Sequence, residues 1–391
     1  MLARASLAEE KPPVAAPPIF NIVASVQYAH TEIYFHTPAG ITPVLANAKE
    51  IAPAQRIDLL VIVPRYAVDA EGRADVSYDL TVHYPNGRTQ AMSSNSVAAK
   101  LKVRPGTLLF PQTIRGFLTG PGDPFGDYRF EVTVHDHVGG ASASQSVVIH
   151  VSESNRPLPL PDKFEASDWL SRYYARPEPR LALPALEAMA GDAALKQKGI
   201  DGLGGVFGFY QQVLADNPWL LPWFKQWYVA GDGDLRHLLG LVLAYAARAD
   251  PGIVADLPKK IQTELAAAGL ELPPPPSATP EKGGQLDALW GRFFASGRFG
   301  PIADLVAVVS AYLPYQGRLE AFKKPATSEQ ALPPEVLKSA LLNSALWSLR
   351  FNAYQHKLVR DYLLYLQEAP DTAPPIKAAL AAALAWKPGK P

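Results

Sequence analysis

The spacing of hydrophobic residues changes near residue 155. Before this point apolar and polar positions alternate, as in residues 128–135, where Tyr, Phe, Val and Val alternate with Arg, Glu, Thr and His. Such alternation is typical of a half-buried strand. After this point apolar residues recur every third or fourth position, and residues 335–366 keep this helical spacing throughout. A run rich in Ser, Asn and Pro separates the two regimes at residues 152–161. The pattern therefore predicts a multidomain protein, with a β domain followed by an α domain.

The first part of the chain predicts an antiparallel β-sandwich over residues 19–152, after a Pro-rich tail at residues 1–18. Runs of alternating or β-branched residues are separated by turn sequences such as Pro85-Asn86-Gly87 and Gly139-Gly140. Many short strands with polar turns are expected of a sandwich. The strands are expected at residues 19–26, 32–36, 57–63, 76–84, 128–134 and 147–151.

One strand of this set carries a family resemblance. The stretch from Gly126 to Asp136, with Tyr128 near its start, resembles the penultimate strand of bacterial immunoglobulin-like and fibronectin-like modules. The resemblance implies a sandwich in which the Tyr128 hydroxyl bonds back to the preceding loop as a tyrosine corner. The chain has no cysteine pair and no Trp before residue 169, so antibody-type domains are excluded. Modules of this kind mostly bind, space or present other domains.

The second part predicts an all-α helical array or bundle over residues 164–390, after a linker at residues 153–163. Apolar residues fall on most sides of the stretch 335–366, which indicates a central, buried helix. No repeat period near 34 residues is present, so a tetratricopeptide array is not expected. The expected helices are residues 167–174, 181–190, 205–215, 219–228, 235–248, 253–268, 285–295, 302–313, 318–322, 335–366 and 376–386.

Two segments of the helical part, residues 286–297 and 345–356, resemble uncharacterised bacterial helical proteins. This resemblance implies no activity. Within the second segment, Asn352 and His356 are i, i+4 neighbours in an apolar stretch. Buried amides must find partners, so we expect these two side chains to bond each other or a loop carbonyl. A ligand site is the alternative interpretation.

Composition and charge narrow the classes of partner. The 391 residues contain 37 Lys plus Arg and 37 Asp plus Glu. Division at residue 160 gives 13 − 14 = −1 for the first part and 24 − 23 = +1 for the second. Neither part has the basic excess that nucleic acid or an anionic membrane calls for. The sequence also lacks a long uncharged apolar stretch, so no membrane span is expected. The absence of cysteine excludes disulfides, thiolate catalysis and zinc–thiolate sites.

The N-terminal residues suggest export. Ser6-Leu7-Ala8 has the small-x-small form of a signal-peptidase site, although Met1 to Ala5 are too few to form the apolar region of a signal peptide. We therefore expect a translation start upstream and a periplasmic or secreted protein, with a cytoplasmic protein as the alternative.

Three tryptophans provide the main candidate site. Trp219, Trp223 and Trp227 recur at i, i+4 and i+8, which places them in one stripe of a helix. Such a stripe is either a platform on which a sugar or partner stacks, or a core-packing face. Core packing is the preferred interpretation, and it predicts that Trp223 is largely buried.

Other candidate groups have simpler explanations. His135 and His137 share one strand face, and His150 could join them as metal ligands, but a solvent-exposed strand face also explains them. The glycine-rich run at residues 199–208 lacks a phosphate-binding pattern and is expected to lead into a tightly packed helix. Asp234 is expected to cap a helix rather than to bind calcium. His237 and His356 are expected at surface or boundary positions rather than as general bases. No cofactor is indicated.

These observations favour a non-enzymatic binding protein, in which the sandwich presents a helical interaction domain to another protein. The alternative is an envelope-associated hydrolase or a glycan-binding protein with its site near Trp219 to Trp227. A cytosolic scaffold is a third interpretation.

Overall fold

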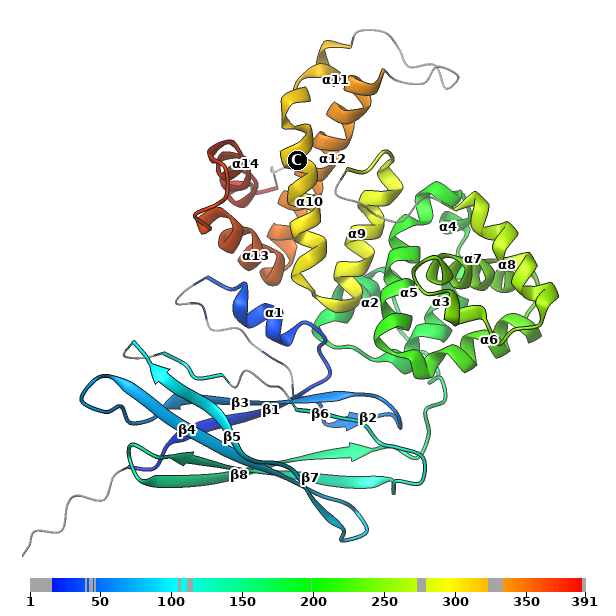
Figure 1. Cartoon of the computed structure of the whole chain (residues 1–391). Helices are drawn as coiled ribbons and strands as arrows, with labels where there is room; N and C mark the ends of the chain where they lie inside the picture. Colours follow the sequence, from blue (N-terminus) through cyan, green and yellow to red (C-terminus); the bar gives the residue numbers. More distant parts are fainter. Residues whose placement is uncertain are drawn as a thin grey trace, which may run out of the picture. The chain divides into compact units, whose positions relative to one another are not determined.

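The computed structural model describes residues 16–38, 41, 45, 47–104, 107–110, 115–197, 199–272, 279–322 and 333–388. The chain divides into two compact units (Figure 1). The first contains the described residues of Met1–Val26 and Asn47–Ser154, and the second those of Gln27–Ala46 and Asn155–Pro391. Most of the Pro-rich tail, the cleavage-like Ser6–Ala8 and the proline run 273–276 lie outside the described residues.

The first unit is built of two β-sheets. One has the strand order β1-β3-β6 and is antiparallel, and the other has the order β2-β8-β7-β4-β5. In the second sheet only the short pairing of β2 with β8 is parallel. The strands are β1 (Ile19–Ser25), β2 (Glu50–Ile51), β3 (Ile57–Arg65), β4 (Arg73–His83), β5 (Thr89–Lys102), β6 (Arg115–Phe117), β7 (Gly126–Asp136) and β8 (Ala141–Val151).

The two sheets share one hydrophobic core. On β7 the alternation places Tyr128, Phe130 and Val132 inside, where each is completely buried. They belong to the same cluster as Leu59 and Val61 of β3, from the other sheet. Strand β3 is buried along most of its length, which explains its nearly continuous apolar sequence.

Strand β5 is the main β element that the sequence prediction missed. Its sequence is rich in Ser, Ala and Lys and poor in β-branched residues, so it lacks a strand signature. It pairs with β4 after the turn at residues 85–87, with register irregularities and a left-handed residue, Asn95, at φ 47°. Pairing with β4 in this hairpin therefore determines its conformation.

The predicted strand at residues 32–36 is wrong, because the chain forms helix α1 (His30–Phe35) there. The prediction also placed this segment in the β domain, whereas it groups with the helical unit. Ile33 is buried in a helical core cluster, and the His36 ring stacks on Phe299 with centroids 3.8 Å apart. The backbone N–H of Phe299 donates to Glu32 at 2.6 Å. These tertiary contacts override a local alternation that is too short to fix the conformation.

The second unit is helical. Among the described residues, no helix is both long and apolar enough to span a membrane. Besides α1, the α-helices are α2 (Ala166–Arg172), α3 (Ala182–Gly191), α4 (Ala193–Gln197), α5 (Gly204–Asp216), α6 (Leu221–Ala230), α7 (Gly233–Ala249), α8 (Lys259–Glu271), α9 (Gly283–Ser296), α10 (Phe299–Tyr312), α11 (Arg318–Ala321), α12 (Pro334–Gln355), α13 (Lys357–Glu368) and α14 (Pro374–Ala385).

Three helix boundaries differ from the prediction. The expected helix at 253–268 is divided, because Pro258 is extended and α8 begins after it. The stretch 335–366 is two helices, since His356 is extended between α12 and α13. The N-cap of α7 is Asp232 rather than Asp234, and Gly233, at φ 51°, allows the chain to enter the helix early.

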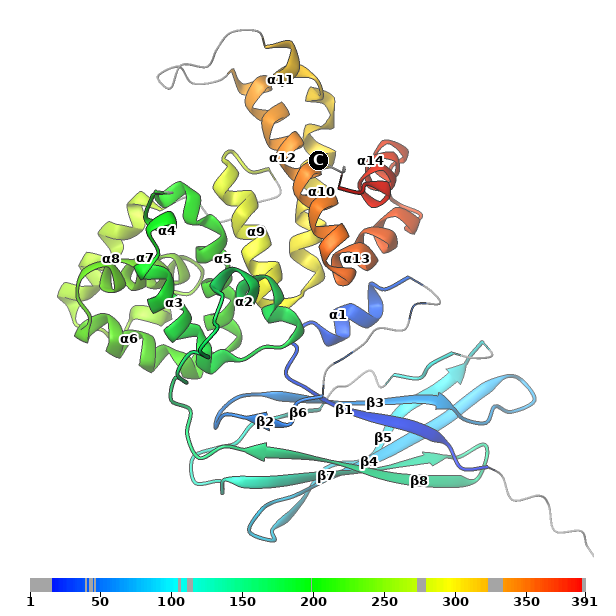
Figure 2. The ribbon, with the colours of Figure 1, turned by 180° about the vertical axis from the view of Figure 1, so that it is seen from behind.

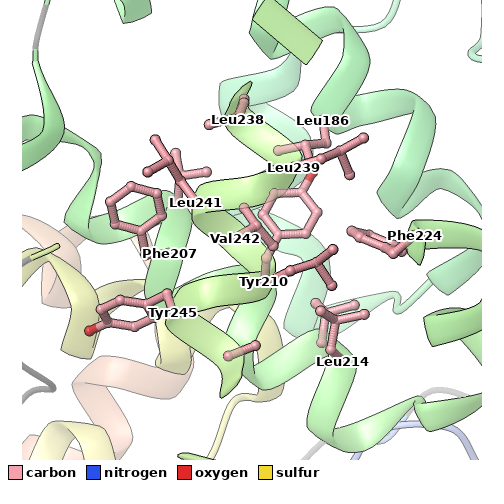
Figure 3. Close-up of a cluster of buried hydrophobic side chains, with 14 of the residues drawn as sticks. Leu186, Phe207, Tyr210, Leu214, Phe224, Leu238, Leu239, Leu241, Val242 and Tyr245 are labelled. Atoms are coloured by element: carbon pink, nitrogen blue, oxygen red, sulfur yellow. The ribbon is translucent and has the colours of Figure 1, made fainter. Parts of the chain in front are cut away.

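The helical unit has two core clusters. The first lies among α3, α5, α6 and α7, where Phe207, Tyr210, Phe224 and Tyr245 pack with leucines of α7 (Figure 3). The second involves α1, α9, α10 and α12 to α14. Figure 2 shows the helices of each cluster from behind.

A glycine seam between α5 and α9 joins the two clusters. A Cβ on Gly204 would lie 2.1 Å from the carbonyl oxygen of Gly284, and one on Gly208 would lie 2.1 Å from that of Ala288. A Cβ on Gly291 would likewise meet the Gly205 oxygen at 2.1 Å. The helices therefore touch backbone to backbone. The prediction that the run 199–208 leads into a tightly packed helix is confirmed.

Candidate interaction surface on the helical unit

The tryptophan stripe lies at the edge of the first helical core. Trp219 precedes α6, Trp223 and Trp227 lie on it, and all three indoles are half-buried against the core cluster. The residues that follow each tryptophan form a second stripe on the same segment. This second stripe is the one that is fully packed, since Leu220, Phe224 and Tyr228 are buried.

The indole N–H of Trp219 is enclosed and has no hydrogen-bond partner among the described residues. Trp223 packs against the core cluster without being fully enclosed, and its neighbour Phe224 takes the completely buried position. The structure thus shows three partly covered indoles rather than an open aromatic platform.

The histidines of the β unit each have a local partner. Nε2 of His135 lies 2.9 Å from Asp79, Nε2 of His137 lies 2.8 Å from the Ser77 hydroxyl, and His150 pairs with Asp127. The backbone N–H of Asn95 and then His135 lower the pKa of Asp79. Within the described residues, no group of three or more His, Asp or Glu side chains is placed to hold a metal ion.

Asp234 and His237 lie beside the glycine-rich run. Both line a pocket of 280 Å³ that also includes Gly199 and Lys196. Asp234 forms an ion pair with Lys196 at 2.6 Å, and this pairing lowers the pKa of Asp234. The pair is largely exposed, so it contributes little to stability.

His356 and Asn352 do not bond each other through their side chains. The Asn352 amide donates to the Ser348 carbonyl, and Nδ1 of His356 lies 3.3 Å from the Tyr174 hydroxyl. Burial lowers the pKa of His356, and burial raises that of Tyr174 to about 12. The neutral imidazole and the protonated phenol therefore share a hydrogen bond whose direction depends on the imidazole tautomer.

A buried carboxylate lies where α5 approaches α10. Asp216 accepts hydrogen bonds from Arg298 at 2.6 Å and from Gln212 at 2.9 Å. Burial raises its pKa more than the Arg298 guanidinium lowers it, and Glu32 raises it further. Both Asp216 oxygens have partners, and the bond to Arg298 ties α5 to the start of α10.

A cluster of aromatic rings with two exposed members lies on α12 and just after α14. We define the aromatic face as Trp347, Phe351, Tyr354 and Trp386. Trp347 is 53% exposed and Tyr354 58% exposed, while Phe351 and Trp386 are half-buried. The rings of Trp347 and Phe351 stack at 5.1 Å, and Trp386 lies 6.4 Å from Phe351 and 6.2 Å from Tyr354. These contacts hold the four rings in one arrangement.

Helices α12 and α14 pack against each other (Figures 1 and 2). A groove is lined by residues of both helices, together with Leu313 and Gln316. It has a volume of 450 Å³. One wall consists of four α14 alanines, Ala378, Ala379, Ala382 and Ala383, and Leu313 and Leu346 lie among the other lining residues. Arg350 lines the groove as well.

The groove and the face share one side of α12. Asn343, Leu346 and Arg350 line the groove, and Trp347, Phe351 and Tyr354 follow the same i, i+3, i+4 spacing. The sequence prediction placed α12 at the centre of the fold and missed this surface. The signal was the aromatic enrichment of that one stripe, while Leu342, Ala345 and Leu349 form the buried side.

Comparisons with known proteins add little. No family model matches the sequence, and no curated protein matches it. Among solved structures, one match is a family 123 glycoside hydrolase from Clostridium perfringens, whose structure was analysed for glycolipid glycan hydrolysis. The identity is 12%, the TM-score is 0.20, and the match covers 47% of this chain and 36% of that enzyme. A likeness at this level supports no inference about fold or activity.

Proposed function

We propose that this chain is a non-enzymatic binding protein, in which an immunoglobulin-like module carries a helical unit that binds another protein. The binding surface is the aromatic face of α12 and α14. The single observation that carries the proposal is the exposure of Trp347 and Tyr354 on a face whose rings are held by one another.

The strand order of the first unit supports the immunoglobulin-like part. If β1, β3 and β6 are strands A, B and E, then β4, β5, β7 and β8 are C, C′, F and G, and the second sheet has the order G-F-C-C′. The short β2, parallel to β8, adds a strand at the G edge.

Tyr128 supports the same assignment. It lies near the start of β7, the proposed strand F, and its hydroxyl donates to the Pro124 carbonyl at 2.6 Å. This is the hydrogen bond expected of a tyrosine corner. Burial raises the Tyr128 pKa to about 12, so the phenol stays protonated as a donor.

The chemistry of the aromatic face favours a protein partner. Tyr and Trp are enriched at interface hot spots, because they combine a large apolar surface with a polar tip and lose little conformational entropy. Phe351 and Trp386 already restrict the two exposed rings, which reduces the cost of ordering them on binding.

The test begins with cross-linking of the tagged protein in its native cells, followed by identification and purification of the partner. Affinity is then measured for the wild type and for Trp347→Ala, Tyr354→Ala and Val229→Ala. Val229 on α6 is 51% exposed and lies outside the face, so it is a matched control.

The two aromatic variants should each weaken binding about 30-fold, as expected when a hot spot of about 2 kcal/mol is lost. Val229→Ala should bind like the wild type. Equal affinities for all four proteins would refute the proposed surface. Trp223→Ala and Trp227→Ala are then measured in the same way, and loss of binding in these two variants alone, with a glycan as the bound species, would instead establish the alternative site on α6.

We also propose that the protein is exported, which rests on the Ser6-Leu7-Ala8 sequence. Fractionation of cells expressing the complete gene should place the protein outside the cytoplasm with its N-terminus at Glu9. Recovery of uncleaved protein in the cytosol would contradict this.

A further inference from the structure

The groove between α12 and α14 has the features of a small-ligand site. Its volume of 450 Å³ lies within the usual range for such sites, and its lining is mostly apolar with a few polar groups. The lining includes the α14 alanines Ala378 and Ala382 and, from α12, Leu346 and Arg350.

The apolar part suits a flexible aliphatic chain. The described lining provides methyl and methylene groups from alanines and leucines and contains no aromatic ring. The α14 wall runs from Pro375 to Ala383, which corresponds to about 12 Å at the helical rise of 1.5 Å per residue. A groove of this length offers much less surface than a macromolecular interface, which usually covers about 800 Å² on each partner.

The charge of the groove indicates the chemistry of the polar end of the ligand. Arg350 is the charged residue among the described lining residues, and its Nε is enclosed without a hydrogen-bond partner among them. Glu320 accepts a hydrogen bond from Asn343, which lies two turns before Arg350 on α12, and no ion pair joins Arg350 to a carboxylate among the described residues. A guanidinium that no described carboxylate holds matches one carboxylate in bidentate geometry.

We infer that this groove binds an aliphatic monocarboxylate, with its carboxylate at Arg350 and its chain along the alanines of α14. The inference goes beyond the proposed protein interaction, because it needs no protein partner and uses residues outside the aromatic face.

Calorimetric titration of the full chain with sodium octanoate, sodium decanoate and 1-decanol tests it. Decanoate should bind about fifteenfold more tightly than octanoate, because each added methylene strengthens binding about fourfold. The uncharged alcohol should bind at least about tenfold more weakly than decanoate, since it lacks the charge-assisted pair.

Two variants locate the site. Arg350→Gln should lose at least about tenfold in decanoate affinity, while Arg318→Gln, which removes an exposed cation outside the lining, should match the wild type. Ala382→Phe should block the groove without disturbing the core, because Ala382 is exposed. Unchanged circular dichroism and unfolding temperature of each variant establish that it has folded.

Carbon-13 NMR of carboxyl-labelled decanoate gives an independent readout, since the nearby guanidinium should lower the pKa of the bound carboxyl group. Absence of binding, equal binding of decanol, or wild-type affinity in Arg350→Gln would each overturn the inference. Trp347→Ala should keep decanoate affinity, so failure of this site and failure of the proposed partner surface are distinguishable.

Discussion

Gly208 on α5 gives the sharpest test of how the helical unit is held together. A methyl group at this position would lie 2.1 Å from the Ala288 carbonyl oxygen and 2.8 Å from its carbonyl carbon. Both neighbours are backbone atoms of α9, so no side-chain rotation relieves the clash. The Gly208→Ala substitution must therefore push α5 away from α9 along the seam that joins the two core clusters.

The magnitude follows from two opposing effects. Alanine favours a helix over glycine by about 1 kcal/mol. Overpacking a tight interface costs about 1–3 kcal/mol and sometimes more, and separation of the helices also weakens dispersion contacts along the seam. Because the clash is backbone against backbone, we expect overpacking at the upper end of this range, which leaves a net loss of about 2 kcal/mol after the gain in helix propensity. For a unit of this size that lowers the unfolding temperature by roughly 4–8 °C.

Gly205→Ala is the matched control. Gly205 is in the same helix, and a Cβ there would meet the Asp287 carbonyl oxygen at 3.6 Å, an ordinary contact. This variant should be neutral or stabilised by up to about 1 kcal/mol. Thermal unfolding followed by helical circular dichroism at 222 nm measures both. If the two variants unfold at the same temperature as the wild type, the backbone contact between α5 and α9 is refuted.

Three further predictions concern other parts of the molecule. Tyr128→Phe should destabilise the β unit by about 1–2 kcal/mol, since the Pro124 carbonyl loses its donor; faster amide exchange in β7 would show this, and unchanged exchange would contradict it. His356 should make the helical unit less stable as pH falls below about 6.5, because burial lowers its pKa in the folded state and the unfolded chain then binds the proton more readily. When the pH is lowered from 7.5 to 5.5, the unfolding temperature should fall less in His356→Gln than in the wild type. An equal fall in both proteins would exclude His356 as the cause. Trp290→Ala should cost about 3–5 kcal/mol, since Trp290 is 7% exposed. Trp347→Ala should cost only about 1 kcal/mol, since Trp347 is 53% exposed and loses mainly its stacking on Phe351; similar unfolding temperatures for both variants would contradict the assignment of Trp347 to the surface.

The change of hydrophobic period predicted the coarse architecture of the chain. Long segments with a strong pattern, such as β7 and α7, were predicted with small boundary errors. The alternation in β7 placed Tyr128 correctly, and its bond to the preceding loop is confirmed. In these segments the local conformational preference and the tertiary packing agree, so the hydrophobic pattern along the chain is sufficient to predict the secondary structure.

The failures occur where tertiary contacts decide the outcome. Strand β5 has a polar, Ser-rich sequence and becomes a strand through its pairing with β4. Residues 32–36 alternate like a strand but form a helix that packs Ile33 into a core and stacks His36 on Phe299. Neither outcome follows from the local pattern, because the partner segments are distant in sequence.

The candidate surface was missed for a related reason. Helix α12 has apolar residues on most of its sides, so the pattern could not show which side is buried. The structure buries Leu342, Ala345 and Leu349 and leaves Trp347 and Tyr354 exposed. The sequence prediction chose the tryptophans near α6 instead, because their regular spacing is visible without knowledge of the neighbouring helices.

Site-specific photo-cross-linking tests the proposed function most directly. A photoreactive phenylalanine analogue replaces Tyr354 on the aromatic face in one strain and the similarly exposed Val229 on α6 in another, and both strains are irradiated as native cells. The account predicts an adduct with one defined protein from position 354, absent at position 229 and lost when Trp347 is also changed to Ala. Adducts of equal yield at both positions, or none at 354 while α6 captures a ligand, would contradict it.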